Sequence, residues 1–237
     1  MALEPLYKMK VKCAYCENVF ETSRVRHSLK KAYKTDTDFC AYYKTMNPDY
    51  YVVRVCPACG FASTENFGDK LSDKQRKDFE SQIKERWVPR AYEGERSWEQ
   101  ALETYQLALL CAQAVSEKKR LIASLLHHIA WLYRYRNDHE QEQRFMQYTL
   151  QEYIRVYELE GVGANNARLL YLIGEINRRL GNYNEAVKWF SRVVHDKKIM
   201  DGAMIRASRE QWQALREEMA ERKLEPTEEM KAAEQGM

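Results

Sequence analysis

The sequence has no long hydrophobic run and no short motif of the common enzyme classes. No apolar stretch approaches the roughly 20 residues that a membrane-spanning helix requires. The first five residues include no apolar stretch of signal-peptide length, so we expect a cytoplasmic protein. Glycine-rich phosphate loops, the His-Glu-x-x-His zinc motif and the Gly-x-Ser-x-Gly nucleophile elbow are all missing. We therefore predict a protein that is not an enzyme.

Neither sign of charge dominates, because 38 Lys and Arg face 35 Asp and Glu, a formal net charge of +3. With 237 residues and 12% aromatics, the chain is long enough for one or two domains with a buried core. Positive charge gathers modestly in residues 1–60, where it makes nucleic-acid binding an alternative function. The basic residues concerned are Lys8, Lys10, Lys12, Arg24, Arg26, Lys30, Lys31 and Lys34.

Four of the six cysteines form two Cys-x-x-Cys pairs, Cys13/Cys16 and Cys56/Cys59. In a reducing compartment paired cysteines indicate a metal more often than a disulfide. Two such pairs supply the four thiolates of a tetrahedral zinc site, with Zn–S bonds of about 2.3 Å. We predict that Cys13, Cys16, Cys56 and Cys59 bind Zn²⁺. Iron is the alternative, since four tetrahedral thiolates serve both metals.

The surroundings of both pairs favour a zinc ribbon, which is a pair of strand hairpins with a cysteine pair at each tip. Residues 8–12 alternate in polarity before the first pair, and residues 19–23 follow it as a return strand would. Residues 50–55 are β-branched and aromatic and lead into the second pair, after which Gly60 suits a turn with positive φ. Residues 28–46 are expected to be an inserted loop or short helix that ends at Asn47-Pro48.

A shell of four thiolates leaves no open coordination position, and the predicted metal is therefore structural. The remaining alternative is a thiol-redox or hydrolytic enzyme. A thioredoxin-like Cys-x-x-Cys requires a βαβ setting, which neither pair has. The other two cysteines, Cys40 and Cys111, are interpreted as small buried hydrophobes.

From Leu71 onward the periodicity becomes that of α-helices. Ser72 and Ser97 are predicted caps of the first two helices, the first of which reaches Trp87. Further helices are predicted at 119–136, 139–159, 166–180, 184–196 and 203–222. The predicted domains are a zinc-ribbon-like module over 1–68, a helical-repeat domain over 69–222 and a flexible tail over 223–237.

Residues 167–194 resemble a tetratricopeptide repeat, in which two antiparallel helices pack closely. The resemblance rests on Gly174 and Ala186, which let the paired helices approach closely, and on Phe190, which fills the space between successive pairs. A weaker unit surrounds Ala130. The predicted fold is mainly α, with tetratricopeptide-like helix pairs and a small N-terminal β-rich zinc ribbon.

The tetratricopeptide resemblance implies a concave groove lined by the first helix of each pair. We predict that this groove binds a protein or peptide, because aromatic and arginine side chains are frequent anchors of such contacts. The alternative is that its residues pack against the helix at 203–222 or against the ribbon. The groove residues are His127, Trp131, Arg134, Tyr171, Glu175 and Arg178.

The whole layout resembles a bacterial family labelled as a domain of unknown function. The resemblance covers nearly the entire chain, and its most specific motif runs from Asn47-Pro48-Asp49-Tyr50-Tyr51 to Cys56-Pro57-x-Cys59-Gly60-Phe61-Ala62. It implies the ribbon-plus-helices architecture and zinc binding, and it supplies no activity.

Overall fold

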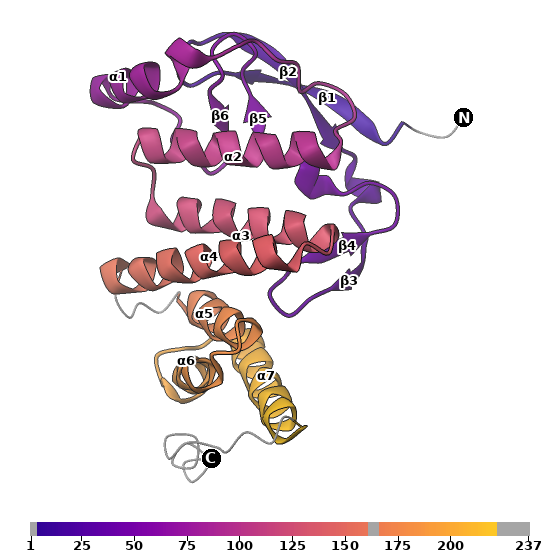
Figure 1. Cartoon of the computed structure of the whole chain (residues 1–237), viewed down its shortest axis with the longest axis vertical. Helices are drawn as coiled ribbons and strands as arrows, with labels where there is room; N and C mark the ends of the chain where they lie inside the picture. Colours follow the sequence, from indigo (N-terminus) through magenta and orange to yellow (C-terminus); the bar gives the residue numbers. More distant parts are fainter. Residues whose placement is uncertain (1–3, 161–165, 222–237) are drawn as a thin grey trace. The chain divides into compact units, whose positions relative to one another are not determined.

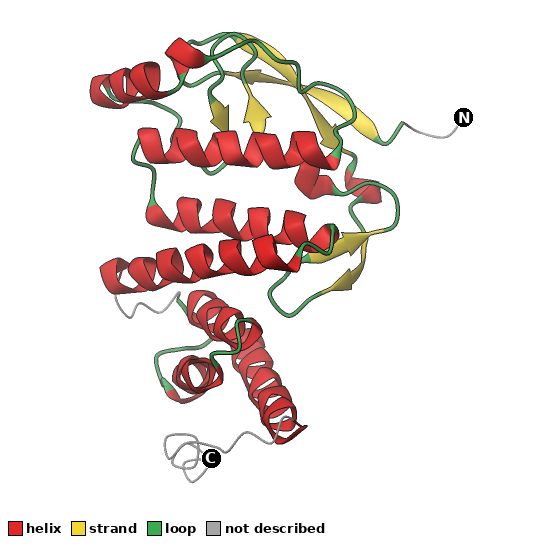
Figure 2. Cartoon of the chain, viewed as in Figure 1, coloured by secondary structure: helices red, strands yellow, loops and turns green. Residues whose placement is uncertain are grey.

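The computed structural model describes residues 4–160 and 166–221, which fall into two compact units, Met1–Phe145 and Met146–Met237. Three antiparallel hairpins come first: β1 (Leu6–Lys12) with β2 (Val19–Val25), β3 (Ala32–Thr35) with β4 (Ala41–Tyr43), and β5 (Arg54–Val55) with β6 (Ala62–Ser63). The helices follow: α1 (Asp73–Gln82), α2 (Trp98–Ala114), α3 (Lys119–Tyr135), α4 (His139–Glu160), α5 (Ala167–Arg179), α6 (Tyr183–His195) and α7 (Gly202–Glu221). The mainly α fold with a small β-rich N-terminal module is confirmed (Figures 1 and 2).

The first hairpin forms as predicted, and the second predicted strand is only partly right. Pairing of β1 with β2 ends at Lys12 and Val19, which leaves residues 13–18 in the turn. In the predicted strand 50–55, only Arg54–Val55 are extended and paired, because Pro48–Tyr51 form a 3-10 helix. Asn47 begins that helix, since its side chain accepts a hydrogen bond of 3.0 Å from the N–H of Asp49.

The inserted segment 28–46 is a β-hairpin, not the loop or short helix that we expected. After a 3-10 turn (His27–Leu29), β3 and β4 pair with each other and lie beside α3. The ring of Tyr42 on β4 meets that of Tyr135 on α3 edge-on at 5.6 Å. The hydroxyl of Tyr135 donates to the carbonyl of Ala41 at 2.9 Å. Aromatic contacts to a distant helix therefore stabilise strands whose short local sequence does not predict them.

The predicted helix caps are confirmed. Ser72 and Ser97 each accept a hydrogen bond from the third residue of their helix, and Gln75 and Gln100 complete two capping boxes. The first helix ends at Gln82 and not at Trp87, because a 3-10 turn (Lys84–Arg86) replaces its last part. The last five predicted helices agree with α3–α7 to within one residue at each end.

The first unit has one continuous core that includes both the hairpins and the helices. It extends from Cys13 and Phe20 through Phe61 and Phe79 to Leu132 of α3. In Figure 1, α2 lies between the β1–β2 and β5–β6 hairpins and α3. The predicted boundary near residue 68 consequently does not separate two compact units. Strands of two to seven residues bury too little apolar surface to form a core of their own.

In the second unit, α5 and α6 pack closely, and α7 packs on both. A Cβ atom on Gly174 would lie 2.8 Å from the ring of Phe190, so only glycine permits this approach. One face of α7 is buried and carries Trp212, Leu215 and Met219. The predicted flexible tail 223–237 lies outside the described residues.

Candidate metal centre

The two cysteine pairs occupy the tips of two hairpins that have the same turn geometry. In the first tip, the N–H of Cys13 donates to Asn18 O (2.9 Å), and the N–H of Glu17 donates to Cys13 O (3.0 Å). In the second tip, Cys56 N–H bonds to Phe61 O (3.0 Å), and the N–H of the residue after Cys59 bonds to Cys56 O (2.9 Å). Each turn therefore closes over five residues and points two sulfur atoms the same way.

The residue after the second cysteine has a positive φ in both turns. It is Glu17, with φ 61°, in the first turn and Gly60, with φ 76°, in the second. The prediction for Gly60 is confirmed. Glu17 is strained in this backbone conformation, because its Cβ crowds the following carbonyl group.

The four sulfur atoms form one compact group. The Sγ atoms of Cys13 and Cys59 are 3.6 Å apart, as are those of Cys16 and Cys56, and all four lie within 4.8 Å of one another. A tetrahedron with metal–sulfur bonds of about 2.3 Å has edges of about 3.8 Å. The predicted residues therefore form a four-thiol cluster that can bind a tetrahedral metal ion.

The electrostatics of the cluster also fit a cation. Hydrogen bonds from Cys13 and Cys59 lower the pKa of Cys56 to about 2. The shared hydrogen bond with Cys56 raises the pKa of Cys13 to about 12, and the hydrogen bond with Cys13 raises the pKa of Cys59. Four thiols at this distance therefore cannot all ionise without a compensating positive charge. A divalent ion supplies that charge.

Helices of the same unit hold both tips in place. Arg76 of α1 donates to the carbonyl of Tyr15 at 2.6 Å, inside the first Cys-x-x-Cys sequence. The indole N–H of Trp87 donates to the carbonyl of Pro57 at 3.0 Å, inside the second. On the far side, Cys111 Sγ of α2 accepts from the N–H of Ala62 at 3.3 Å. Residues of α1, of α2 and of the segment that follows the 3-10 turn thus fix the position of the sulfur atoms.

Cys40 and Cys111 are both buried, as predicted, and neither belongs to the cluster of four. Burial raises the pKa of each thiol to about 12. Both therefore stay protonated at neutral pH.

The predicted groove residues of α3 point into the protein. Asp38, at the tip between β3 and β4, is fully buried. Its carboxylate accepts hydrogen bonds from the three predicted groove residues of α3, which are His127, Trp131 and Arg134. Arg134 reaches Asp38 through two bonds of 2.7 and 2.9 Å, and Trp131 donates to it at 3.0 Å. His127 lies 3.3 Å from the same carboxylate. The β3–β4 hairpin therefore covers this face of α3, in line with the packing alternative.

The predicted groove residues of α5 are likewise engaged within the protein. Tyr171 and Glu175 are buried. Arg178 forms ion pairs with Glu175 at 2.9 Å and with Glu218 of α7 at 3.1 Å. The helix at 203–222 thus contacts this face, again as the packing alternative expects.

Sequence reasoning missed Arg96, which is 4% exposed and whose side chain donates hydrogen bonds to three backbone carbonyl groups. Its guanidinium group donates to Tyr50 O (2.9 Å), Val53 O (2.8 Å) and Tyr92 O (3.1 Å). These bonds hold the segment that leads into the second cysteine pair. No sequence signal could have shown this, because Arg96 lies between a bend and a helix cap in a stretch with other charged residues.

Half of the basic residues behind the nucleic-acid alternative are already paired. Carboxylates lie at 2.5–3.1 Å from the charged nitrogens of four of them, in the pairs Lys8–Glu21, Lys12–Glu17, Arg24–Glu65 and Lys34–Asp36. Paired charges are less available for phosphate groups.

A protein-family model described as an uncharacterized protein conserved in bacteria (DUF2225) matches residues 6–215. The chain belongs to this family. No curated protein and no solved structure matches the chain at a significant level. The match confirms the resemblance seen in the sequence, and its description names no activity. Among the described residues, every helix is too short or too polar to cross a membrane.

Proposed function

We propose that this family member is a cytoplasmic, non-enzymatic protein in which Zn²⁺ at Cys13, Cys16, Cys56 and Cys59 stabilises a surface that binds a protein or peptide. The helix pair α5–α6 is tetratricopeptide-like in its close packing at Gly174. The partner-binding surface lies on the first unit, because the groove residues of α3 and α5 are engaged internally.

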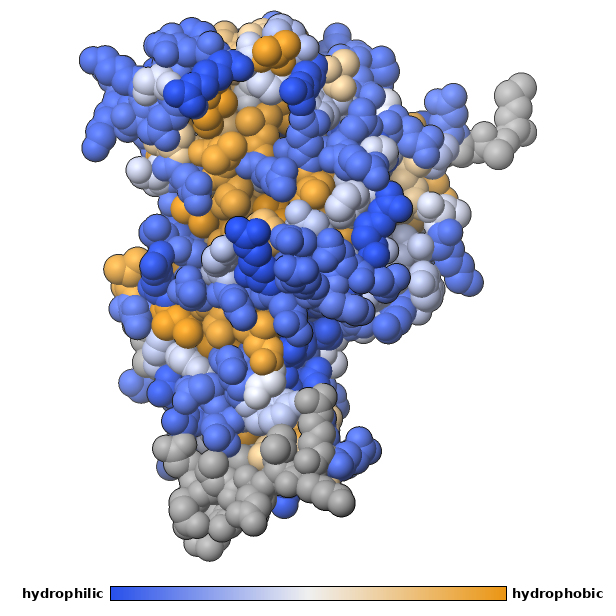
Figure 3. Space-filling model, in the orientation of Figure 1, coloured by the Kyte–Doolittle hydropathy of each residue, from blue (hydrophilic) through white to orange (hydrophobic). Residues whose placement is uncertain are grey.

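A hollow beside α2 carries the proposal. It has a volume of about 260 Å³, and residues of α2 and of the segment 86–92 line it. Val88 is 65% exposed and Leu110 is 54% exposed, and both line this hollow. Hydrophobic residues gather on the surface over α2 in Figure 3. Two large exposed apolar side chains at one hollow indicate a contact surface, because such groups gain free energy when a partner covers them.

The hollow is mechanically linked to the metal centre. Trp87 lines it and also packs on Gly60, where an added Cβ would lie 2.5 Å from the indole ring. The same indole donates to the carbonyl of Pro57 between Cys56 and Cys59. A metal that holds the second cysteine pair therefore also holds one wall of the hollow.

The charged residues at the rim of the hollow indicate which kind of peptide would bind there. Arg90 is paired with Glu103, whereas Arg86 has no ion pair within residues 4–160 and 166–221. An apolar side chain inserted between Val88 and Leu110, with a carboxylate beside it for Arg86, complements this surface. The expected partner is thus a peptide segment with a large apolar residue next to Asp or Glu.

Selection from a random peptide library on the immobilised, metal-loaded full chain tests the proposal. The expected consensus has one large apolar residue adjacent to an acidic residue. Affinity for a selected peptide should fall by about tenfold or more in Leu110→Asp, since a buried unpaired charge replaces an apolar contact. Val19→Asp is the matched control, because Val19 is 60% exposed and lies outside the hollow.

Either of two results would overturn the proposal. The first is a selection that yields no enriched peptide. The second is an enriched peptide whose affinity Leu110→Asp leaves unchanged. Equal melting temperatures of the two variants show that the substitution acts on binding and not on folding.

A further inference from the structure

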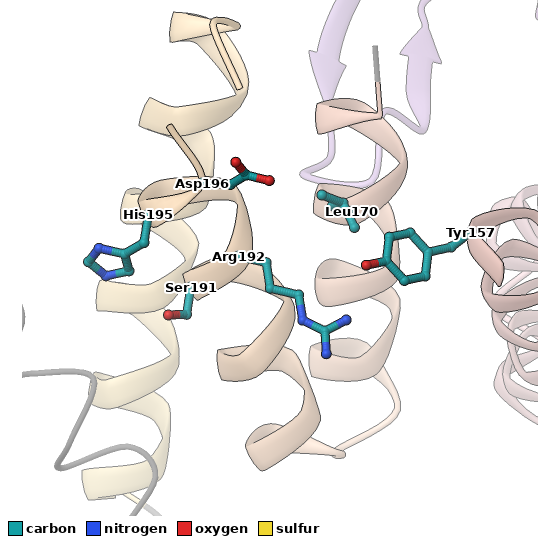
Figure 4. A pocket seen from close by; sticks show the side chains of 6 residues that line it. All are labelled: Tyr157, Leu170, Ser191, Arg192, His195 and Asp196. Atoms are coloured by element: carbon teal, nitrogen blue, oxygen red, sulfur yellow. The ribbon is translucent and has the colours of Figure 1, made fainter. Parts of the chain in front are cut away.

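A second hollow, of about 550 Å³, lies entirely within the second unit (Figure 4). Its volume is within the range of small-molecule sites. Tyr157 of α4 and Leu170 of α5 line it together with Ser191, Arg192, His195 and Asp196 at the end of α6. In Figure 4, Arg192 and Asp196 both extend from α6 and its end, with the guanidinium group and the carboxylate apart from each other, and Leu170 and Tyr157 lie across from them.

Arg192 offers unused hydrogen-bond donors to this hollow. Its guanidinium group lies 4.4 Å from the ring centre of Trp189 and 5.8 Å from that of Tyr157. These cation–π contacts orient the group and leave its N–H donors free. Among the described residues Arg192 has no ion pair, whereas Arg178 on the neighbouring helix has two. Within the described part of the chain, Arg192 is therefore a pre-oriented cation that no carboxylate neutralises.

Asp196 is held apart from Arg192 by its own local contacts. Residues four apart on a helix can form an ion pair. However, α6 ends at His195, and the backbone of Asp196 is extended (φ −71°, ψ 108°). One oxygen of Asp196 accepts from the N–H of Lys198 at 2.9 Å. Two opposite charges thus line the hollow at separate places, and no ion pair between them is found among the described residues.

We propose that this hollow binds a small dipolar ligand of the aliphatic amino-acid type. Arg192 and the Tyr157 hydroxyl bind its carboxylate, the buried side chain of Leu170 contacts its methylene groups, and Asp196 binds its ammonium group. A phosphate dianion fits less well, because Asp196 repels a second negative charge. This site is independent of the partner-binding surface on the first unit.

The test uses the full chain and follows the side-chain Nε–H signal of Arg192 by NMR. Loss of this signal in Arg192→Met assigns it. Four probes are titrated: 5-aminopentanoate, pentanoate, pentylammonium and inorganic phosphate. We expect saturable shifts with 5-aminopentanoate and about tenfold weaker binding of each probe that lacks one charged end. Phosphate should bind more weakly than pentanoate.

Two variants test separately the contacts with the ammonium end and the carboxylate end of the ligand. Asp196→Asn should equalise the affinities for 5-aminopentanoate and pentanoate, and Arg192→Met should remove binding of both, as monitored by the indole signal of Trp189. Arg209→Met, at an exposed arginine of α7, is the matched control and should change nothing. Unsaturable shifts, equal affinity for all four probes, or unchanged binding in Arg192→Met would overturn the proposal.

Discussion

At the residue scale, Asp38 is a buried charge with several hydrogen-bond partners. It is fully buried, and its two oxygens accept hydrogen bonds from α3 side chains and from the N–H of Cys40. A buried carboxylate in this setting is tolerated only because its partners are in place. The polar residues of α3 that resemble a binding face thus serve to dock the β3–β4 hairpin.

His127 belongs to this network and should make the first unit sensitive to acid. Burial lowers the pKa of His127 below its usual value, and nearby His128 and Arg134 lower it further, against the opposing effect of Asp38. The unfolded chain therefore takes up a proton, at a pKa of about 6.5, before the folded chain does. The contribution of His127 to the free energy of unfolding is fully present above this pH. It falls as the pH drops below it, by at most about 1.4 kcal/mol per pH unit.

Urea unfolding of His127→Gln at about pH 7.5 and about pH 5.5 measures this effect. The glutamine amide can still donate to Asp38 but does not titrate, so this variant should lose less stability on acidification than the wild type. The control is His139→Gln, at a histidine whose side chain is 78% exposed. Comparing variants under equal metal loading removes any contribution of the cysteine cluster, because metal binding by thiolates weakens in acid. Identical acid losses in wild type and His127→Gln would contradict the prediction.

At the scale of elements, the two hairpin tips have the same turn but a different residue at the position with positive φ. Gly60 adopts it without strain, and its missing side chain lets Trp87 pack on the turn. Glu17 adopts it despite its side chain and forms an exposed ion pair with Lys12 at 2.8 Å. Such exposed pairs stabilise little. The two tips therefore tolerate substitution differently.

Gly60→Ala should destabilise the metal-bound protein by about 2 kcal/mol or more, because it combines backbone strain with a clash against Trp87. It should also speed the transfer of metal to a coloured chelator. Glu17→Gly should be neutral or stabilising by up to about 1 kcal/mol. Denaturant unfolding with metal present measures both changes.

Gly94→Ala is the matched control for the clash, because Gly94 has φ +80° and no atom within 4 Å of an added Cβ. It reports the cost of the backbone conformation alone. A loss for Gly60→Ala no larger than that for Gly94→Ala would show that packing of Trp87 on the turn is unimportant.

At the scale of the whole molecule, the cysteine cluster belongs to the core and is not an appendage. Three of its four cysteines are buried and belong to the same continuous core as α2 and α3. A structural zinc ion contributes about 10–16 kcal/mol in small modules, which rivals the entire stability of a domain. Loss of the metal should therefore be felt far beyond the hairpin tips.

Chelation of the full chain, followed by hydrogen exchange, tests this expectation. Amides in the β1–β2 and β5–β6 hairpins should lose protection, and so should α2, because Cys111 contacts the second tip. The core around Gly174 and Phe190, which includes none of the four cysteines, is the internal reference. Elemental assay should find one equivalent of metal per chain before chelation. Much less than one equivalent, or unchanged exchange after its removal, would contradict the role of the cluster.

The sequence alone determined the features that depend on neighbouring residues. The spacing within each cysteine pair already defines a two-sulfur tip, because the intervening residues close a local turn. Ser72 and Ser97 predicted where two helices begin, since a cap bonds to residues only three positions away. The small size of Gly174 and Ala186 predicted the close packing of α5 and α6, because the two helices are joined by a short turn.

Only the tertiary structure decided the features that join residues far apart in the chain. Asp38 and Arg134 are 96 positions apart in the sequence and form a hydrogen bond in the fold. Because of this contact, the polar face of α3 packs against the β3–β4 hairpin, where the sequence predicted a binding face and a loop. Arg96 reaches back to Tyr50 and Val53 in the same way. The hollow at Val88 and Leu110 likewise brings the segment after the 3-10 turn together with α2. No local pattern encodes these contacts, because their free energy comes from desolvation and packing that exist only once the chain has folded.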